Sequence, residues 1–258
     1  MIPIRHAPDA TKNDLLTHNP TDRGVSNCEW LKHTGTLDRV QERGGILLLG
    51  GTSMAHFRIR VAQSHIRSDL LPSFWSLAGV LLDDQKFASV PLDICGDISA
   101  VAQNNGVSEC SLADYDNPER FPNIAVLHFT SDSQPINTNI EQIKRQRSII
   151  DIPSLILQWL SYVWATGQSG NPLLGGHGLP SAAFIETVYG IAGIELTPGL
   201  SSVASCPEAI WLTAKWWKKF YEETTGTGVS RQAKAIVPAG NFAIRQPAAF
   251  VVQDEIVF

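Results

Sequence analysis

The feature that most constrains the fold is a run of four aliphatic residues, Ile46-Leu47-Leu48-Leu49, closed by the glycine pair Gly50-Gly51. A short run with no polar position is typical of a buried strand, and the two glycines indicate a turn directly after it. Residues 74–82 are rich in aromatic and branched side chains and end at Asp83-Asp84, a turn signal. Residues 86–92 can return as the antiparallel partner, so we expect a hairpin after the first strand.

Proline marks the expected helix starts in the second half of the chain. Pro153, Pro180 and Pro207 each stand at the beginning of a segment with apolar residues at helical spacing, and proline is favoured in the first turn of a helix. The expected elements are helices over 53–67, 96–106, 140–150, 152–165, 180–192 and 208–223, a strand over 124–129, an irregular polar loop over 108–123, and two β-rich pieces within 235–257 around Pro238 and Pro247. This mixture predicts the α+β class, with a small antiparallel sheet packed against helices.

Composition favours one domain. The 258 residues are 43% hydrophobic and only 17% charged, which is enough apolar material for one sizeable core and leaves no polar stretch to separate two. Residues 1–43 mix proline, asparagine, aspartate and threonine with little periodicity, so we expect an extension that wraps the domain or stays loose. The ordered domain is expected to span residues 44–258, beginning at Gly44.

Charge and hydropathy exclude several classes of partner. The formal net charge is -5, and the basic residues are scattered apart from two short clusters, which argues against a nucleic-acid partner. We expect those clusters, residues 144–147 and 215–219, to lie on solvated helix faces. The N-terminal residues show no signal peptide, and the longest apolar run, residues 152–165, is shorter than the roughly 20 residues that a membrane span requires. We therefore expect a cytoplasmic protein without a membrane span.

The sequence favours neither a metal nor a cofactor. Four cysteines are irregularly spaced, so we expect free thiols and no disulfide framework. There is no CxxC or HExxH segment that would indicate zinc, and the glycines form neither a GxGxxG pattern nor a phosphate-binding loop with lysine. The expected cofactors are therefore none.

The segment that most strongly suggests chemistry is Ser205-Cys206-Pro207-Glu208. It places the thiol of Cys206 directly before a helix, where unpaired backbone N–H groups and the helix dipole favour the thiolate and lower its pKa. The alternative is a buried structural thiol, because free cysteine is among the most buried residue types. The pattern supports both interpretations about equally.

Three stretches together resemble the circularly permuted papain-like proteins related to NlpC peptidases and to lecithin:retinol acyltransferase. Residues 45–51 are similar to the opening strand of that family, residues 75–81 to its "SHxGI" strand, and residues 205–210 to its "CSELV" helix start. Their order is that of the permuted branch, and the likeness covers residues 44–220. The resemblance implies a papain-like domain with Cys206 as nucleophile.

One position departs from the family. The general base of the family is the histidine of the "SHxGI" strand, and the matching position here is Leu77, which cannot accept a proton. The best substitute is His177, in the glycine-rich segment 175–178 just before the helix expected at 180–192, although a surface loop histidine is the more ordinary interpretation. His56, His65 and His128 have weaker claims.

Two functions are implied by the resemblance. The first is a cysteine hydrolase, a peptidase or amidase, with Cys206 and His177 as catalytic residues and an acyl-thioester intermediate. The second is a non-catalytic papain-fold protein that lost its base at Leu77 and binds a peptide, amide or protein partner.

Overall fold

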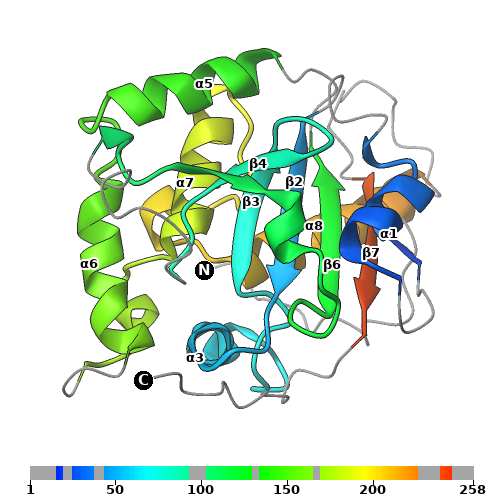
Figure 1. Ribbon diagram of the computed structural model, residues 1–258, viewed down its shortest axis with the longest axis horizontal. Coiled ribbons are helices and arrows are strands. Elements are labelled where there is room, and N and C mark those ends of the chain that lie inside the picture. Colours follow the sequence, from blue (N-terminus) through cyan, green and yellow to red (C-terminus); the bar gives the residue numbers. More distant parts are fainter. Residues whose placement is uncertain are drawn as a thin grey trace.

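A seven-stranded sheet forms the centre of the protein in the computed structural model (Figure 1), which describes residues 16–19, 25–37, 44–92, 103–129, 134–164, 169–225 and 239–245. The strands are β1 Leu16–His18, β2 Gly45–Gly50, β3 Leu77–Leu81, β4 Lys86–Ser89, β5 Ser108–Ser111, β6 Asn123–His128 and β7 Ala239–Ile244, in the order β1-β7-β6-β2-β3-β4-β5. All neighbouring pairs are antiparallel except β1 and β7, which are parallel. The sheet is therefore mixed and larger than the small antiparallel sheet that the sequence predicts.

The helices are α1 Asn27–His33, α3 Met54–Ala62, α5 Gln134–Arg145, α6 Ile152–Val163, α7 Pro180–Ile191 and α8 Pro207–Thr225, with short 3-10 turns η2 Ser64–Ile66, η3 Leu112–Tyr115, η4 Pro172–Gly175 and η5 Ser202–Ala204. The helix starts expected at the three prolines are confirmed, because Pro180 and Pro207 open α7 and α8 and Pro153 lies in the first turn of α6. The α+β class is confirmed with them.

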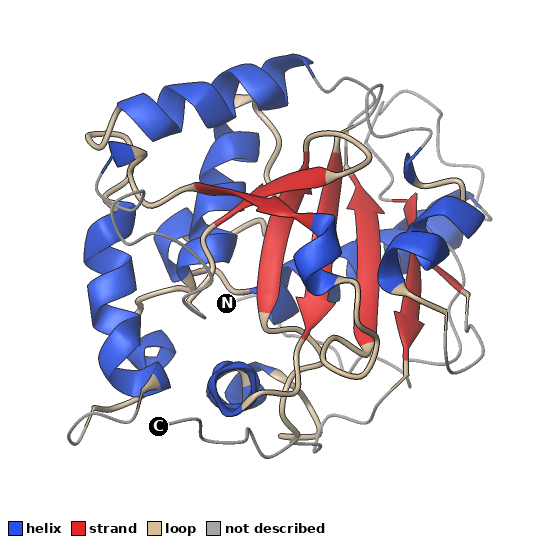
Figure 2. Cartoon of the chain, in the orientation of Figure 1, coloured by secondary structure: helices blue, strands red, loops and turns tan. Residues whose placement is uncertain are grey.

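Both faces of the sheet are covered (Figure 2). On one face, which we name the helical face, strand residues such as Ile46, Leu48 and Val80 pack against helices α3, α5, α6, α7 and α8. On the opposite face, the α1 face, Leu47 and Leu77 and their neighbours pack against α1 and η3. Successive side chains of a strand point to opposite faces, so a wholly apolar strand such as β2 fits only a sheet that is covered on both sides.

Two pieces of the expected N-terminal extension belong to this core. Strand β1 pairs with β7 at the edge of the sheet, and α1 buries Trp30 completely on the α1 face. The side-chain amide of Asn27 donates hydrogen bonds to the carbonyl oxygens of Tyr115 and Phe121, at 2.8 and 2.9 Å, which fixes α1 to the segment after β5. These contacts correct the expected start of the ordered core at Gly44.

The predicted segments have mixed outcomes. The β2 strand, the hairpin of β3 and β4, and the strand at β6 are confirmed, whereas the loop expected over 108–123 is wrong because it contains β5 and η3. Most of the helix expected over 96–106 and the β-rich piece around Pro247 lie outside the described residues. In the part of the chain that the structure describes, no helix combines the length and the apolar character that crossing a membrane would require.

Candidate functional site

Cys206 is the N-cap residue of α8. Its carbonyl oxygen accepts the hydrogen bond of the Ile210 N–H at 3.2 Å, and Pro207, which has no N–H to leave unpaired, occupies the first helical position. The side chain is only 2% exposed and belongs to the apolar cluster on the helical face. The thiol therefore lies at a helix N-terminus, as the sequence predicts, but inside the core.

Burial controls the ionisation of this thiol. Removal from water raises the pKa of Cys206 to about 12, although the backbone N–H groups of Ala209 and Glu208 act in the opposite direction. The nearby carboxyl groups of Glu208 and Glu186 raise it further. Burial therefore outweighs the lowering that the sequence predicts from the helix N-terminus, and Cys206 is a neutral thiol at physiological pH.

Glu208, in the first turn of α8, is a buried carboxyl group with a cationic partner. It is 1% exposed, and its oxygens meet the guanidinium of Arg67 at 3.2 Å and the hydroxyl of Ser73 at 2.5 Å. Arg67 also forms two hydrogen bonds with Asp69. The backbone N–H of Glu208 donates to the Gln63 side chain at 2.9 Å, so this network attaches α8 to the end of α3.

Glu186, in the middle of α7, is a second buried carboxyl group, and its surroundings differ. It is 6% exposed, and one oxygen accepts hydrogen bonds from the hydroxyls of Thr197 at 2.6 Å and Ser205 at 2.9 Å. Among the described residues, no lysine or arginine pairs with it. Burial raises the pKa of Glu186, and the Glu195 carboxyl acts in the same direction.

A cavity of about 200 Å³ lies beside Glu186, between the C-terminal half of α7 and the segment that leads to η5. We name it the α7 cavity. Its lining includes the carboxyl residues Glu186 and Glu195, the hydroxyl residues Thr197 and Ser202, and the apolar residues Ile194 and Leu200. Ser205, next to Cys206, reaches the same Glu186 oxygen as Thr197, so the α7 cavity and the N-terminus of α8 share one hydrogen-bond network.

The backbone directly after His177 is hydrogen-bonded close to this network, whereas the side chain of His177 is exposed. The N–H groups of Gly178 and Leu179 donate to the carbonyl oxygens of Val203 and Ser205, at 2.7 and 2.9 Å. The imidazole is exposed and lies next to Gly175. A Cβ atom added at Gly175 would be 3.3 Å from the ring. No hydrogen bond joins the described side chains of His177 and Cys206, so the two predicted catalytic residues share a neighbourhood without forming a pair.

Leu77 lies on the wrong face of the sheet for the family's chemistry. It belongs to the cluster on the α1 face, whereas Cys206 belongs to the cluster on the helical face. Side chains at positions 78 and 80 point toward the helices instead. A histidine placed at position 77 would therefore face α1 and η3 rather than the thiol.

Sequence reasoning missed Glu186 and its two hydroxyl partners. A signal was present, because Glu186 is the only charged residue in the largely apolar segment 180–191. A charged side chain in an apolar helix is seldom buried without a specific partner. Nothing in the sequence indicates that Thr197 and Ser205, eleven and nineteen residues away, are those partners.

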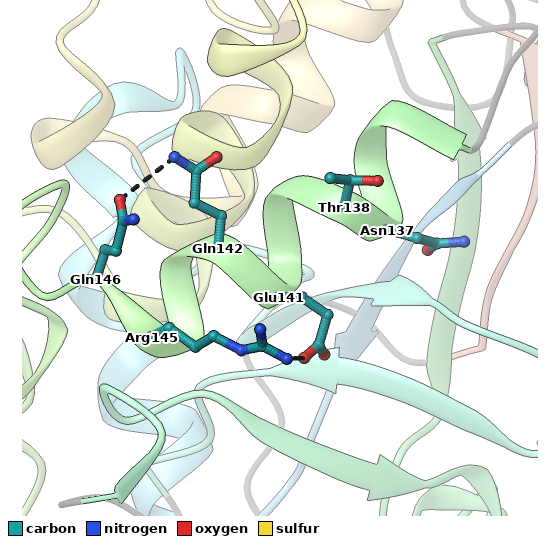
Figure 3. A pocket seen from close by; sticks show the side chains of 6 residues that line it. All are labelled: Asn137, Thr138, Glu141, Gln142, Arg145 and Gln146. Atoms are coloured by element: carbon teal, nitrogen blue, oxygen red, sulfur yellow. Dashed lines mark hydrogen bonds and ion pairs between the residues drawn. The ribbon is translucent and has the colours of Figure 1, made fainter.

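A second hollow lies on the outer surface of α5 (Figure 3), lined by Asn137, Thr138, Glu141, Gln142, Arg145 and Gln146. These side chains come from α5 and from Gln146, which directly follows it, and they interact along this segment through the hydrogen bond from Gln142 to Gln146 and the ion pair of Arg145 with Glu141. Polar groups from different elements do not converge there, so the α7 cavity is the better candidate site.

The residues that the structure describes contain no group of three histidine, cysteine, aspartate or glutamate side chains that could hold a metal ion. Comparison of the chain with family models, with curated proteins and with solved structures gives no match. The function of the chain therefore has to be inferred from the geometry of the α7 cavity and of the α8 N-terminus.

Proposed function

We propose that this chain is a binding protein with a papain-like arrangement of strands and helices, in which Cys206 is a structural residue. The observation that carries this proposal is the state of the thiol, which is 2% exposed with a pKa raised to about 12. A nucleophilic cysteine must be ionised and within reach of the substrate. Two further observations support it: Leu77 lies on the opposite face of the sheet and has no proton acceptor, and the His177 ring is exposed and makes no hydrogen bond with the sulfur.

The binding surface that we assign is the α7 cavity with its rim. Ile191, Leu200 and Val203 come from this part of the chain and expose 44%, 43% and 43% of their surface, which suits contact with a peptide or protein partner. The cavity brings carboxyl and hydroxyl groups next to these apolar side chains. A few fixed polar groups in an otherwise apolar surface are typical of ligand sites.

The reactivity of Cys206 tests the proposal. Native protein is treated with iodoacetamide between pH 6 and 9, and modification of Cys206 is followed by mass spectrometry of its peptide. We expect slow alkylation over this range, at least tenfold slower than that of a synthetic peptide with the sequence of residues 203–210. The chain unfolded in urea should react like the peptide, which separates burial from any intrinsic property of the segment. Rapid alkylation of the native chain below pH 8 would contradict the proposal.

A cysteine hydrolase is the second candidate, and one observation favours it. Backbone hydrogen bonds hold residues 178–179 next to residues 203–205. His177 directly precedes this pair, so a rotation of its side chain toward Cys206 is a local change. In that function the Cys206 thiolate attacks an amide carbonyl, the amine leaves with a proton, and water then hydrolyses the acyl-thioester. Covalent capture of a peptidyl vinyl sulfone by the native chain, lost in Cys206→Ser, would support the hydrolase; no capture would speak against it.

A further inference from the structure

The two buried glutamates near the start of α8 differ in their charge compensation. Glu208 meets the guanidinium of Arg67, whereas the recorded hydrogen-bond donors to Glu186 are the hydroxyls of Thr197 and Ser205 and the backbone N–H of Thr197, all of them uncharged. Both residues are buried, with Glu208 1% and Glu186 6% exposed. Burying a carboxylate is costly unless a cation pairs with it, so Glu186 can accept a cationic partner that the described part of the chain does not supply.

The α7 cavity lies where such a partner would reach Glu186. It has a volume of about 200 Å³, and Glu186 and Thr197 are among the residues that line it. Engineered apolar cavities of about 150 Å³ hold a molecule the size of benzene, so this volume suits a group of a few heavy atoms. Ile194 and Leu200 provide apolar surface for a short hydrocarbon chain next to the charged end.

We propose that the α7 cavity binds a primary ammonium group on a short aliphatic chain, such as the end of a lysine side chain of a peptide or protein partner, with Glu186 as the counter-ion. The ammonium nitrogen donates to the Glu186 carboxylate, and the Thr197 hydroxyl holds that carboxylate in place. Glu195, exposed at the same cavity, adds a second negative charge. This inference rests on the proposed binding function and names the chemistry that the α7 cavity recognises.

Other ligand classes fit the lining less well. An anion would meet two carboxyl groups and no lysine, arginine or histidine among the lining residues. A divalent cation such as calcium takes six to eight oxygen ligands, usually from several carboxylates, and two glutamates with two hydroxyls fall short of that set. Apolar side chains in the lining add nothing to metal binding but do add to the binding of an alkylammonium ion.

The test titrates the full chain with n-butylammonium, and in parallel with n-butanol and with calcium chloride, while amide NMR signals of Gly190 and Gly199 are followed. Both glycines line the α7 cavity and report directly on it. We expect saturable shifts with n-butylammonium only. In Glu186→Gln the affinity should fall at least tenfold, because the amide oxygen still accepts from Thr197 and Ser205 but carries no charge.

A second variant tests the α7 cavity without changing Glu186. A side chain added at Gly190 meets no atom within 4 Å and stands in a helix, so Gly190→Leu should fold and fill the α7 cavity. Its matched control is Gly170→Leu, at an equally open position that does not line the cavity. We expect Gly190→Leu to abolish n-butylammonium binding and Gly170→Leu to leave it unchanged.

Three results would overturn the inference: equal shifts with n-butanol, shifts with calcium alone, or undiminished n-butylammonium binding in Gly190→Leu. Absence of any saturable shift in the native chain would also overturn it. These outcomes leave the alkylation rate of Cys206 unaffected, so a failure of the ammonium site is distinguishable from a failure of the proposed function.

Discussion

At Cys206, two opposing effects act on one sulfur atom. The N-terminus of α8 favours the thiolate through the N–H groups of Ala209 and Glu208, and burial in the helical-face core favours the neutral thiol. Burial is the larger effect, because the pKa rises to about 12. The thiol then serves α8 as a weak capping acceptor that fits an apolar environment.

Substitution of Cys206 separates capping from reactivity. Serine keeps an acceptor at the N-cap position, whereas alanine removes it and leaves a small void. We expect Cys206→Ala to lower the free energy of unfolding by about 1–3 kcal/mol, and Cys206→Ser to lose less than that, as measured by urea denaturation. Loss of partner binding in both variants without a change in stability would instead indicate a catalytic or ligand-contacting sulfur.

Among the elements, α1 shows how a polar-looking segment joins the core. Ser26 caps the helix by accepting from the Glu29 N–H, and Trp30 and Leu31 point to the sheet from a segment whose other side chains are mostly polar. The Trp30 indole N–H donates to the carbonyl of Asn19 at 2.9 Å, which connects α1 to the end of β1. Two apolar residues therefore place this short helix on the α1 face, where it packs together with η3.

Truncation of Trp30 tests whether α1 is part of the folding unit. Replacement of a fully buried tryptophan by alanine usually costs about 3–5 kcal/mol, and we expect Trp30→Ala to fall in that range by urea denaturation. Trp164→Ala is the control, because Trp164 is 51% exposed at the end of α6 and should cost less than about 1 kcal/mol. Equal effects of the two substitutions would mean that residues 25–37 are peripheral to the domain.

Across the whole molecule, buried carboxyl groups link stability to pH. Burial raises the pKa of Glu186, so below its ordinary value of 4.5 the carboxyl is protonated in both folded and unfolded chains. As the pH rises, the unfolded chain releases this proton first, and folding loses stability until the pH passes the raised pKa of the folded state. Glu195 and the Cys206 thiol are the neighbours that couple to it.

Glu186→Gln removes the part of the pH dependence of stability that comes from Glu186. We expect the variant to gain stability relative to the native chain as the pH rises above 4.5, by about 1.4 kcal/mol for each pH unit by which burial raises the pKa. Urea denaturation at intervals between pH 4.5 and 8 measures the difference. A difference that is constant with pH would show that Glu186 titrates normally in the folded chain.

Local signals in the chain were enough to predict most of its elements. The apolar run of β2, the turn after β3 and the prolines of α6, α7 and α8 act within a few residues, so strands, helices and the α+β class could be read from the sequence. The position of Cys206 before a helix was predictable for the same reason.

The contacts between those elements could not be predicted from local signals, because they form only when the chain is packed. The face of the sheet to which Leu77 points, the burial of Cys206 and the exposure of His177 depend on strand register and on which helix covers which face. The partners of Glu186 come from segments that meet only when α7 and α8 pack together. Desolvation and charge pairing act between residues that are distant in sequence, and for that reason the chemistry of the site depends on tertiary packing rather than on motifs.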